Sequence, residues 1–173
     1  MLEKVVGSFA IKGLKGVNMD HSEIVRALES CELFRELGKS DIEKVAGLCR
    51  GENYRPGEYV FRQGEPGKQI YIISEGHVFL ERSVDLGPRK GNAIICTLGK
   101  GRALGCWSTL LDEPHYLMAS ATCQKATKIV VMNGADLRDM MLSNIDLGLN
   151  VFRKLCFILR DRLQGAFGAM EKI

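Results

Sequence analysis

The 173 residues carry 24 lysine and arginine side chains against 21 aspartates and glutamates, so the formal net charge is +3. Hydrophobic residues make up 46% of the chain and charged residues 26%, a composition that is typical of one globular domain and excludes a disordered or collagen-like chain. The small positive charge gives no reason to expect a nucleic-acid partner. No apolar run approaches the roughly 18 residues that suggest a membrane span.

Six cysteines are spread along the chain without the spacing of a metal site. None forms a C-x-x-C pair, and no histidine lies at metal-ligand spacing from any of them. Because they stand among Leu, Ile and Val, we expect inert core thiols in a reducing cytoplasm. A redox sensor or an iron–sulfur site is the alternative. The positions are Cys31, Cys49, Cys96, Cys106, Cys123 and Cys156.

Residues 1–19 are expected to form an N-terminal arm. Glu3 is acidic, and Gly7 and Lys12 interrupt the apolar core that a signal peptide needs. An amphipathic stretch that touches a membrane or a partner is the alternative for this segment.

Residues 20–50 are predicted to form two helices. Apolar residues at three- and four-residue steps place the first helix before Gly38, which stops it: Ile24, Ala27, Leu28, Cys31, Phe34 and Leu37. The sequence Ser40-Asp-Ile-Glu43 predicts a capping box that starts the second helix. This helix is expected to end at Gly51.

Residues 52–132 change to short β-branched and aromatic runs separated by glycine turns. Many short strands with regular turn signals predict an all-β sandwich or barrel. The lack of helices between these strands argues against a doubly wound fold. The predicted strands are Glu58–Arg62, Gln69–Ser74, His77–Arg82, Ala93–Leu98, Leu117–Thr122 and Thr127–Met132.

Helices return after Asn133. Ala135–Leu142 is predicted to be a short helix, and Ser143 is expected to cap a long one, about 40 Å in length, that includes residues 146–173. Its apolar residues follow steps of three and four, as in a coiled-coil seam. This stripe exceeds what one small β-domain must cover, so we predict a homodimerisation helix. The predicted seam is Phe152, Leu155, Leu159, Leu163, Ala166 and Met170.

The stretch from Tyr54 to Val78, with glycines at 57, 64, 67 and 76, points to a family. It closely resembles the opening of the cyclic nucleotide-binding domain. This is the effector domain of the catabolite activator protein and fumarate-nitrate regulator superfamily, also found in protein kinase A regulatory subunits and cyclic-nucleotide-gated channels. The resemblance covers residues 22–165. It implies a mainly β fold with flanking helices, in which a double-stranded β-helix, or jelly roll, over residues 20–145 precedes a long C-terminal helix.

The resemblance also implies a ligand site in residues 104–116, here called the cassette. In the family, a glutamate after a glycine binds the ribose 2′-hydroxyl, an arginine after a proline pairs with the cyclic phosphate, and a short helix offers it N–H groups. Here the glutamate position is Cys106, and the arginine position is His115, or Pro114 if the alignment shifts by one. The family positions in this chain are Gly105, Cys106, Trp107, Ser108, Thr109, His115 and Tyr116.

Two further positions bear on the predicted ligand site. In catabolite activator protein, two hydroxyl residues of the C-terminal helix reach the base, and the matching positions here are Ala166 and Phe167. Trp107, the sole tryptophan, either packs the cassette helix against the barrel or forms a wall for an apolar ligand. His115 could replace the arginine in part when it is protonated. Without the glutamate and arginine, we expect binding of cyclic AMP or cyclic GMP to be weak.

The sequence predicts a binding module and no enzyme. It contains no cupin-type histidine pair, no G-x-S-x-G elbow and no P-loop. We expect a stand-alone cytoplasmic sensor without a metal, which forms a homodimer and signals to a protein partner. Direct DNA binding is not expected, because no winged helix-turn-helix fits before Ile173. The alternatives are a scaffold without a ligand and the truncated effector half of a transcription regulator.

Overall fold

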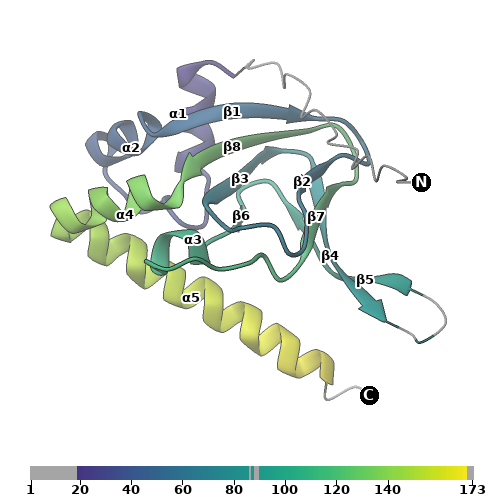
Figure 1. Ribbon diagram of the computed structural model, residues 1–173. Coiled ribbons are helices and arrows are strands. Elements are labelled where there is room, and N and C mark those ends of the chain that lie inside the picture. The colour runs from purple at the N-terminus through teal and green to yellow at the C-terminus, as the bar shows by residue number, and fades with distance from the viewer. Residues whose placement is uncertain (1–18, 86, 88–89, 171–173) are drawn as a thin grey trace, which may run out of the picture.

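The computed structural model describes residues 19–170 except 86, 88 and 89 (Figure 1). Two four-stranded antiparallel sheets, with strand orders β1-β8-β3-β6 and β2-β7-β4-β5, form a sandwich that helices flank. This architecture confirms the predicted mainly β jelly roll with a long C-terminal helix. The predicted N-terminal arm lies outside the described residues apart from Met19. The elements are α1 (His21–Glu29), α2 (Lys39–Ala46), β1 (Cys49–Tyr54), β2 (Tyr59–Phe61), β3 (Gln69–Glu75), β4 (His77–Asp85), β5 (Lys90–Gly99), β6 (Ala103–Leu104), α3 (Trp107–Leu110), β7 (Ser120–Cys123), β8 (Thr127–Asn133), α4 (Gly134–Ser143) and α5 (Ile145–Met170).

Strands β3 and β8 form the wall between two hydrophobic cores. Successive side chains of a strand point to opposite faces of its sheet. Ile70 and Ile72 of β3 therefore pack with the helices, in what we call the helix-side core. Tyr71 and Ile73 point the other way, into the inter-sheet core. The same alternation occurs in β8, which explains why both segments are nearly continuous apolar runs in the sequence.

The two N-terminal helices differ from the prediction in their ends. A capping box starts α1, because the Asp20 side chain accepts the N–H of Glu23 and the Glu23 side chain accepts the N–H of Asp20. The helix ends at Glu29, well before Gly38, and tight turns follow it. The predicted capping box at Ser40 is wrong, since α2 already begins at Lys39 and has no side-chain cap.

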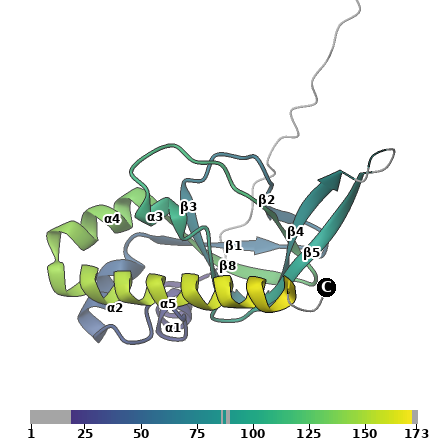
Figure 2. The same ribbon diagram turned by 90° about the horizontal axis from the view of Figure 1, so that it is seen from below.

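The six predicted strands are present with shifted ends, and β1 and β6 are additional. Gly51 was predicted to end a helix, but it lies inside β1. A Cβ at this position would lie 2.5 Å from the Cβ of Met19, so the close approach of Met19 requires a glycine. Strands β4 and β5 are longer than predicted and form a hairpin that projects from the sandwich (Figures 1 and 2).

Helix α5 covers the helix-side core along much of its length (Figure 2). Its cap is Asn144, whose Oδ1 accepts the N–H of Leu147 at 3.2 Å. Ser143, the predicted cap, instead donates its hydroxyl to the carbonyl of Met140 at 3.0 Å. Within the described ranges, no helix combines the length and the hydropathy needed to cross a bilayer.

The sequence predicted that all six cysteines lie in the core, but two of them do not. Cys31, Cys106 and Cys123 are buried and Cys49 is half-buried, whereas Cys96 and Cys156 are exposed. Burial raises the pKa of Cys31 and of Cys49 to about 12 in each case. The expectation of inert core thiols is therefore wrong for Cys96, on the projecting hairpin, and for Cys156, on α5.

Candidate ligand site at the cassette

The cassette leaves β6 through Gly105 and enters the single-turn helix α3. Gly105 has a φ of +73°, and a Cβ there would lie 2.3 Å from the carbonyl oxygen of Gln69. Residues other than glycine rarely adopt this conformation. The Gly105 carbonyl accepts the N–H of Ser108 at 3.0 Å, which closes the turn. Backbone geometry alone therefore accounts for this glycine.

Cys106, at the family's glutamate position, does not offer its side chain to solvent. The residue is 2% exposed and belongs to the helix-side core. Burial raises the pKa of its thiol, and the nearby guanidinium of Arg162 acts in the opposite direction. The structure therefore contradicts the assignment of Cys106 as a ligand-facing residue.

A cavity of about 440 Å³ opens between the cassette loop, the turn before β3 and the start of α4. We call it the cassette cavity. Of the predicted ligand residues, it brings together Ser108, His115 and Tyr116, while Gly105, Cys106 and Trp107 do not line it. The cavity is lined by Pro66, Gly67, Lys68, Ser108, Leu111, Asp112, Glu113, Pro114, His115, Tyr116, Asn133, Ala135 and Arg138.

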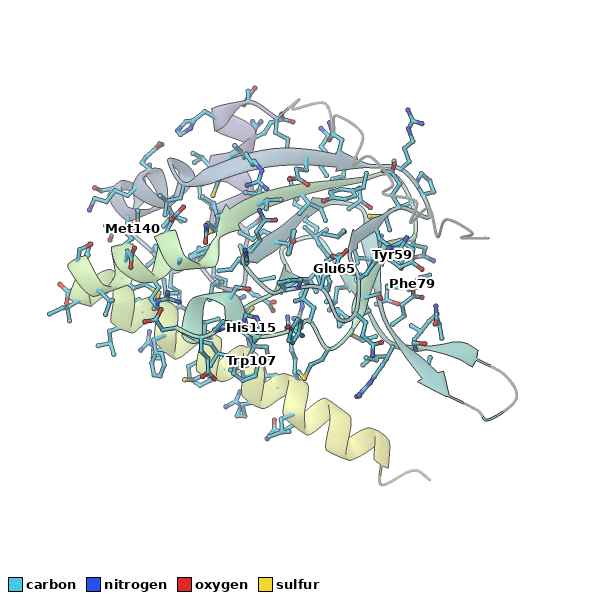
Figure 3. All side chains as sticks on the ribbon, in the orientation of Figure 1. Tyr59, Glu65, Phe79, Trp107, His115 and Met140 are labelled. Carbon is cyan, nitrogen blue, oxygen red and sulfur yellow. The ribbon has the colours of Figure 1, made fainter. Side chains whose placement is uncertain are left out.

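The two aromatic residues of the cassette leave the cavity open. Trp107, on α3, is 40% exposed, and Tyr116 is 71% exposed. Trp107 and His115 both lie near α3 (Figure 3). Trp107 is therefore neither a buried core residue nor a wall of the cassette cavity, so neither of its two predicted roles is met.

Ser108 and His115 bury polar atoms that have no hydrogen-bond partner among the described residues. These atoms are Oγ of Ser108 and both ring nitrogens of His115. The imidazole packs against Gly67, where a Cβ would lie 2.1 Å from its Nε2. Gly134 packs against the backbone of Ser108, since a Cβ at Gly134 would lie 2.3 Å from the Ser108 carbonyl oxygen. Buried polar groups normally have partners, so three unpartnered atoms beside one cavity make it the candidate site.

Two cations that were not among the predicted site residues line this cavity. Arg138 of α4 donates to the carbonyl of Leu111 at 2.8 Å and to Asp112 Oδ1 at 2.6 Å, and so holds the cassette loop. Lys68 lies before β3, and no ion pair occupies its ammonium group within the described ranges. In the same ranges, no cluster of His, Cys, Asp and Glu residues suits a metal ion.

The start of the cassette is tied to α5 by a group that we call the Glu32 clasp. The N–H of Ala103, on β6, donates to Glu32 Oε1 at 2.9 Å, and Arg162 of α5 donates to the carbonyl of Ala103. Glu32 also pairs with Arg102 at 2.8 Å and with Arg162 at 3.6 Å. Since β6 is an end strand, these side chains take the hydrogen bonds that a further strand would otherwise make.

The predicted seam on α5 divides between two faces. Leu155 is fully buried in the helix-side core, so it cannot contact a partner and its assignment is corrected. A second set of side chains points away from the core, and its members are four, three, four, three and four residues apart along the helix. We call this set the α5 face: Ile145, Leu149, Phe152, Cys156, Leu159 and Leu163. Leu159 is half-buried and the others are exposed.

Four of the predicted site residues are described through their backbone only. Thr109 lies in α3, and Ala166, Phe167 and Met170 lie in the last turns of α5. Their side chains fall outside the described part of the structure. Their predicted contacts with a ligand or a partner therefore remain predictions.

The two sheets, the cassette and the long α5 define a jelly-roll domain. Residues 51–144, more than half of the chain, match the model of the family described as cyclic nucleotide-binding domain. The chain belongs to this family. The described residues form one such domain and contain no second one.

Individual relatives agree with this assignment. A putative potassium channel protein from Rhodopseudomonas palustris is 34% identical over 63% of this chain, which covers only 25% of that protein. A cyclic nucleotide-binding domain from Methylobacillus flagellatus superposes with a TM-score of 0.72, at 20% identity, over 92% of this chain and 88% of that one. The regulatory subunit of a cAMP-independent protein kinase A from Trypanosoma cruzi has a TM-score of 0.57, at 22% identity, over 66% of this chain and 39% of that one.

Proposed function

We propose that this chain is a regulatory module, without catalytic activity, that binds cyclic nucleotides weakly and acts in the cytoplasm as a homodimer on a protein partner. The proposal of weak cyclic nucleotide binding rests on the burial of Cys106 in the helix-side core. The residue that would hold the ribose in the family is thus replaced by a thiol that faces away from the cassette cavity.

The expected loss of affinity follows from the missing charged partners. Each hydrogen bond to a charged group contributes about 1.5–3 kcal/mol, so losing the glutamate and arginine together weakens binding by roughly a hundredfold to ten-thousandfold. Lys68 and Arg138 do not fully replace them, because Asp112 already occupies Arg138. We therefore expect cyclic nucleotides to bind no better than in the high micromolar range.

A ligand without a phosphate fits this cassette better than a cyclic nucleotide. The Trypanosoma cruzi regulatory subunit was solved bound to guanosine, which is a nucleoside without a phosphate. This supports the view that a cassette of this fold can serve a ligand other than a cyclic nucleotide.

Calorimetric titration with cyclic AMP, cyclic GMP, adenosine and guanosine tests the proposal. The expected result is weak or absent heat for the two cyclic nucleotides. Submicromolar binding of either one would contradict the proposal, since it would show that the remaining cassette suffices to hold the phosphate.

The α5 face carries the proposal of a homodimer. Its apolar residues repeat every three or four positions along the helix, the spacing with which two helices pack side by side. In a parallel pair, Ile145, Phe152 and Leu163 would each meet their counterparts across a two-fold axis. Movement of α5 is then the route by which the cassette would reach a partner, through the Glu32 clasp.

Light scattering tests the dimer with matched variants. Phe152→Asp together with Leu163→Asp places charge in the seam and is expected to give monomers. Gln164→Asp adds one such charge next to Leu163 but outside the seam, and is expected to leave the dimer intact. A wild-type protein that is monomeric at micromolar concentration would refute the dimer.

Disulfide formation at Cys156 tests whether the two α5 helices of the dimer run parallel. In a parallel pair in register, its two copies face each other at a distance that a disulfide can bridge. Mild oxidation should then give a covalent dimer that Cys156→Ser abolishes. An unlinked wild type would contradict the parallel arrangement.

A further inference from the structure

The unpartnered polar atoms of the cassette cavity include two that can donate a hydrogen bond to a ligand oxygen: the Ser108 hydroxyl and one ring nitrogen of His115. Ser108 is 5% exposed, and its hydroxyl has no partner within the described residues. A buried hydroxyl without a partner carries a desolvation cost, which a ligand oxygen would remove. A neutral imidazole at His115 can donate from one ring nitrogen, and Lys68 supplies an ammonium group.

The start of α4 adds to this preference. Asn133 and Ala135 bring the N-terminus of this ten-residue helix to the cavity wall. The N-terminus of a helix carries a partial positive charge that stabilises anions. The unpartnered side chains of Ser108 and His115 are independent evidence for a ligand at this position.

The cavity wall carries two cations and two anions, so it favours a ligand with no more than one negative charge. Arg138 is paired with Asp112, so this pair contributes little net charge. Glu113 lies exposed on the cavity wall and opposes a second negative charge. Lys68 remains to pair with one carboxylate. A phosphate dianion would meet more repulsion here than a carboxylate.

Part of the cavity wall is apolar. Pro66, Leu111, Pro114 and the ring of Tyr116 offer hydrocarbon surface to the same space. The volume of about 440 Å³ lies in the range of small-molecule pockets. The ligand therefore combines an apolar body with one anionic group.

We propose that the cassette cavity binds a small organic acid, with its carboxylate toward Ser108, His115 and Lys68 and its apolar body against Leu111 and Tyr116. The inference deepens the proposed function, because it rests on the same cassette and names a ligand class for it. It does not depend on the homodimer.

Benzoate, benzamide and inorganic phosphate separate the three chemistries in one titration. Trp107, the sole tryptophan, lies next to Ser108 in α3 and provides a fluorescence signal, and calorimetry gives an independent measurement. We expect saturable binding of benzoate and at least about tenfold weaker binding of benzamide, which has the same shape without the charge. Phosphate is expected to bind more weakly than benzoate.

Two variants with matched controls locate the site. Ser108→Ala and Lys68→Met should each weaken benzoate binding about tenfold. Ser108→Ala should not lower the melting temperature, because it removes a hydroxyl that has no partner. Ser143→Ala and Lys125→Met change the same residue types outside the cavity and should bind benzoate as the wild type does.

Three outcomes with the wild-type protein would overturn the inference. They are equal binding of benzoate and benzamide, tighter binding of phosphate than of benzoate, and the absence of saturable benzoate binding. Wild-type affinity in both cavity variants would do the same. A monomeric protein that binds benzoate would support this inference while refuting the homodimer, so the two proposals can fail separately.

Discussion

Replacement of Glu32 by alanine is expected to lower the free energy of unfolding by about 2–3 kcal/mol. Glu32 is the centre of the clasp between the cassette and α5. Its side chain is 15% exposed and accepts the N–H of Ala103, a residue that is 0% exposed. Alanine would leave that N–H buried without a partner.

The magnitude follows from the separate contacts. An unpaired buried N–H costs about 1–3 kcal/mol. The ion pairs with Arg102 and Arg162 add less, because these side chains are 43% and 33% exposed and such pairs contribute about 0–1 kcal/mol each. The loss of the hydrogen bond therefore outweighs the loss of the charge.

Glu32→Gln is the matched control, since its amide oxygen can still accept the N–H of Ala103. Urea unfolding followed by circular dichroism should show a smaller loss for this variant than for alanine, about 0–1 kcal/mol for each of the two ion pairs. Equal destabilisation by alanine and glutamine would refute the reasoning, because it would mean that charge holds the clasp together.

Two further predictions concern the cassette turn and the thiols. Gly105→Ala should destabilise the protein by more than the roughly 1–2 kcal/mol that a positive φ costs, because the added Cβ would also collide with the Gln69 carbonyl. Gly57→Ala, with a φ of +80° and open space around it, measures the φ contribution alone in the same urea unfolding experiment. Equal losses of stability in the two variants would exclude the collision. In the native protein, Cys96 should react with Ellman's reagent and the buried thiols should not, which mass spectrometry of the labelled peptides can check; labelling of a buried cysteine before unfolding would contradict the core described here.

The strands could be predicted because their signals are local, whereas the end of α1 could not. Beyond Glu29, the chain makes successive tight turns. The N–H of Phe34 donates to the carbonyl of Cys31, and the N–H of Leu37 donates to the carbonyl of Phe34. These turns place apolar residues three positions apart, as a helix does. Strand β1 was missed because its sequence is polar and contains Gly51, which the close packing of Met19 requires there.

The candidate site was predictable only where its residues are neighbours in the sequence. Ser108 and His115 belong to one segment, so the family resemblance found them. Lys68 and Arg138 reach the cavity from other elements, and only the folded chain brings them there. On α5, residues three and four apart are both neighbours, so spacing alone could not decide between Leu155 and Cys156 as the residue that follows Phe152.

The wall formed by β3 and β8 has a consequence for folding cooperativity. Because the two strands line both cores, neither core can lose its packing without exposing the other. We expect a single unfolding transition, and amide hydrogens of Ile72 and Val130 that exchange only through global unfolding. The projecting β4–β5 hairpin lies outside this shared wall, so its amides should exchange through local opening long before the sandwich comes apart.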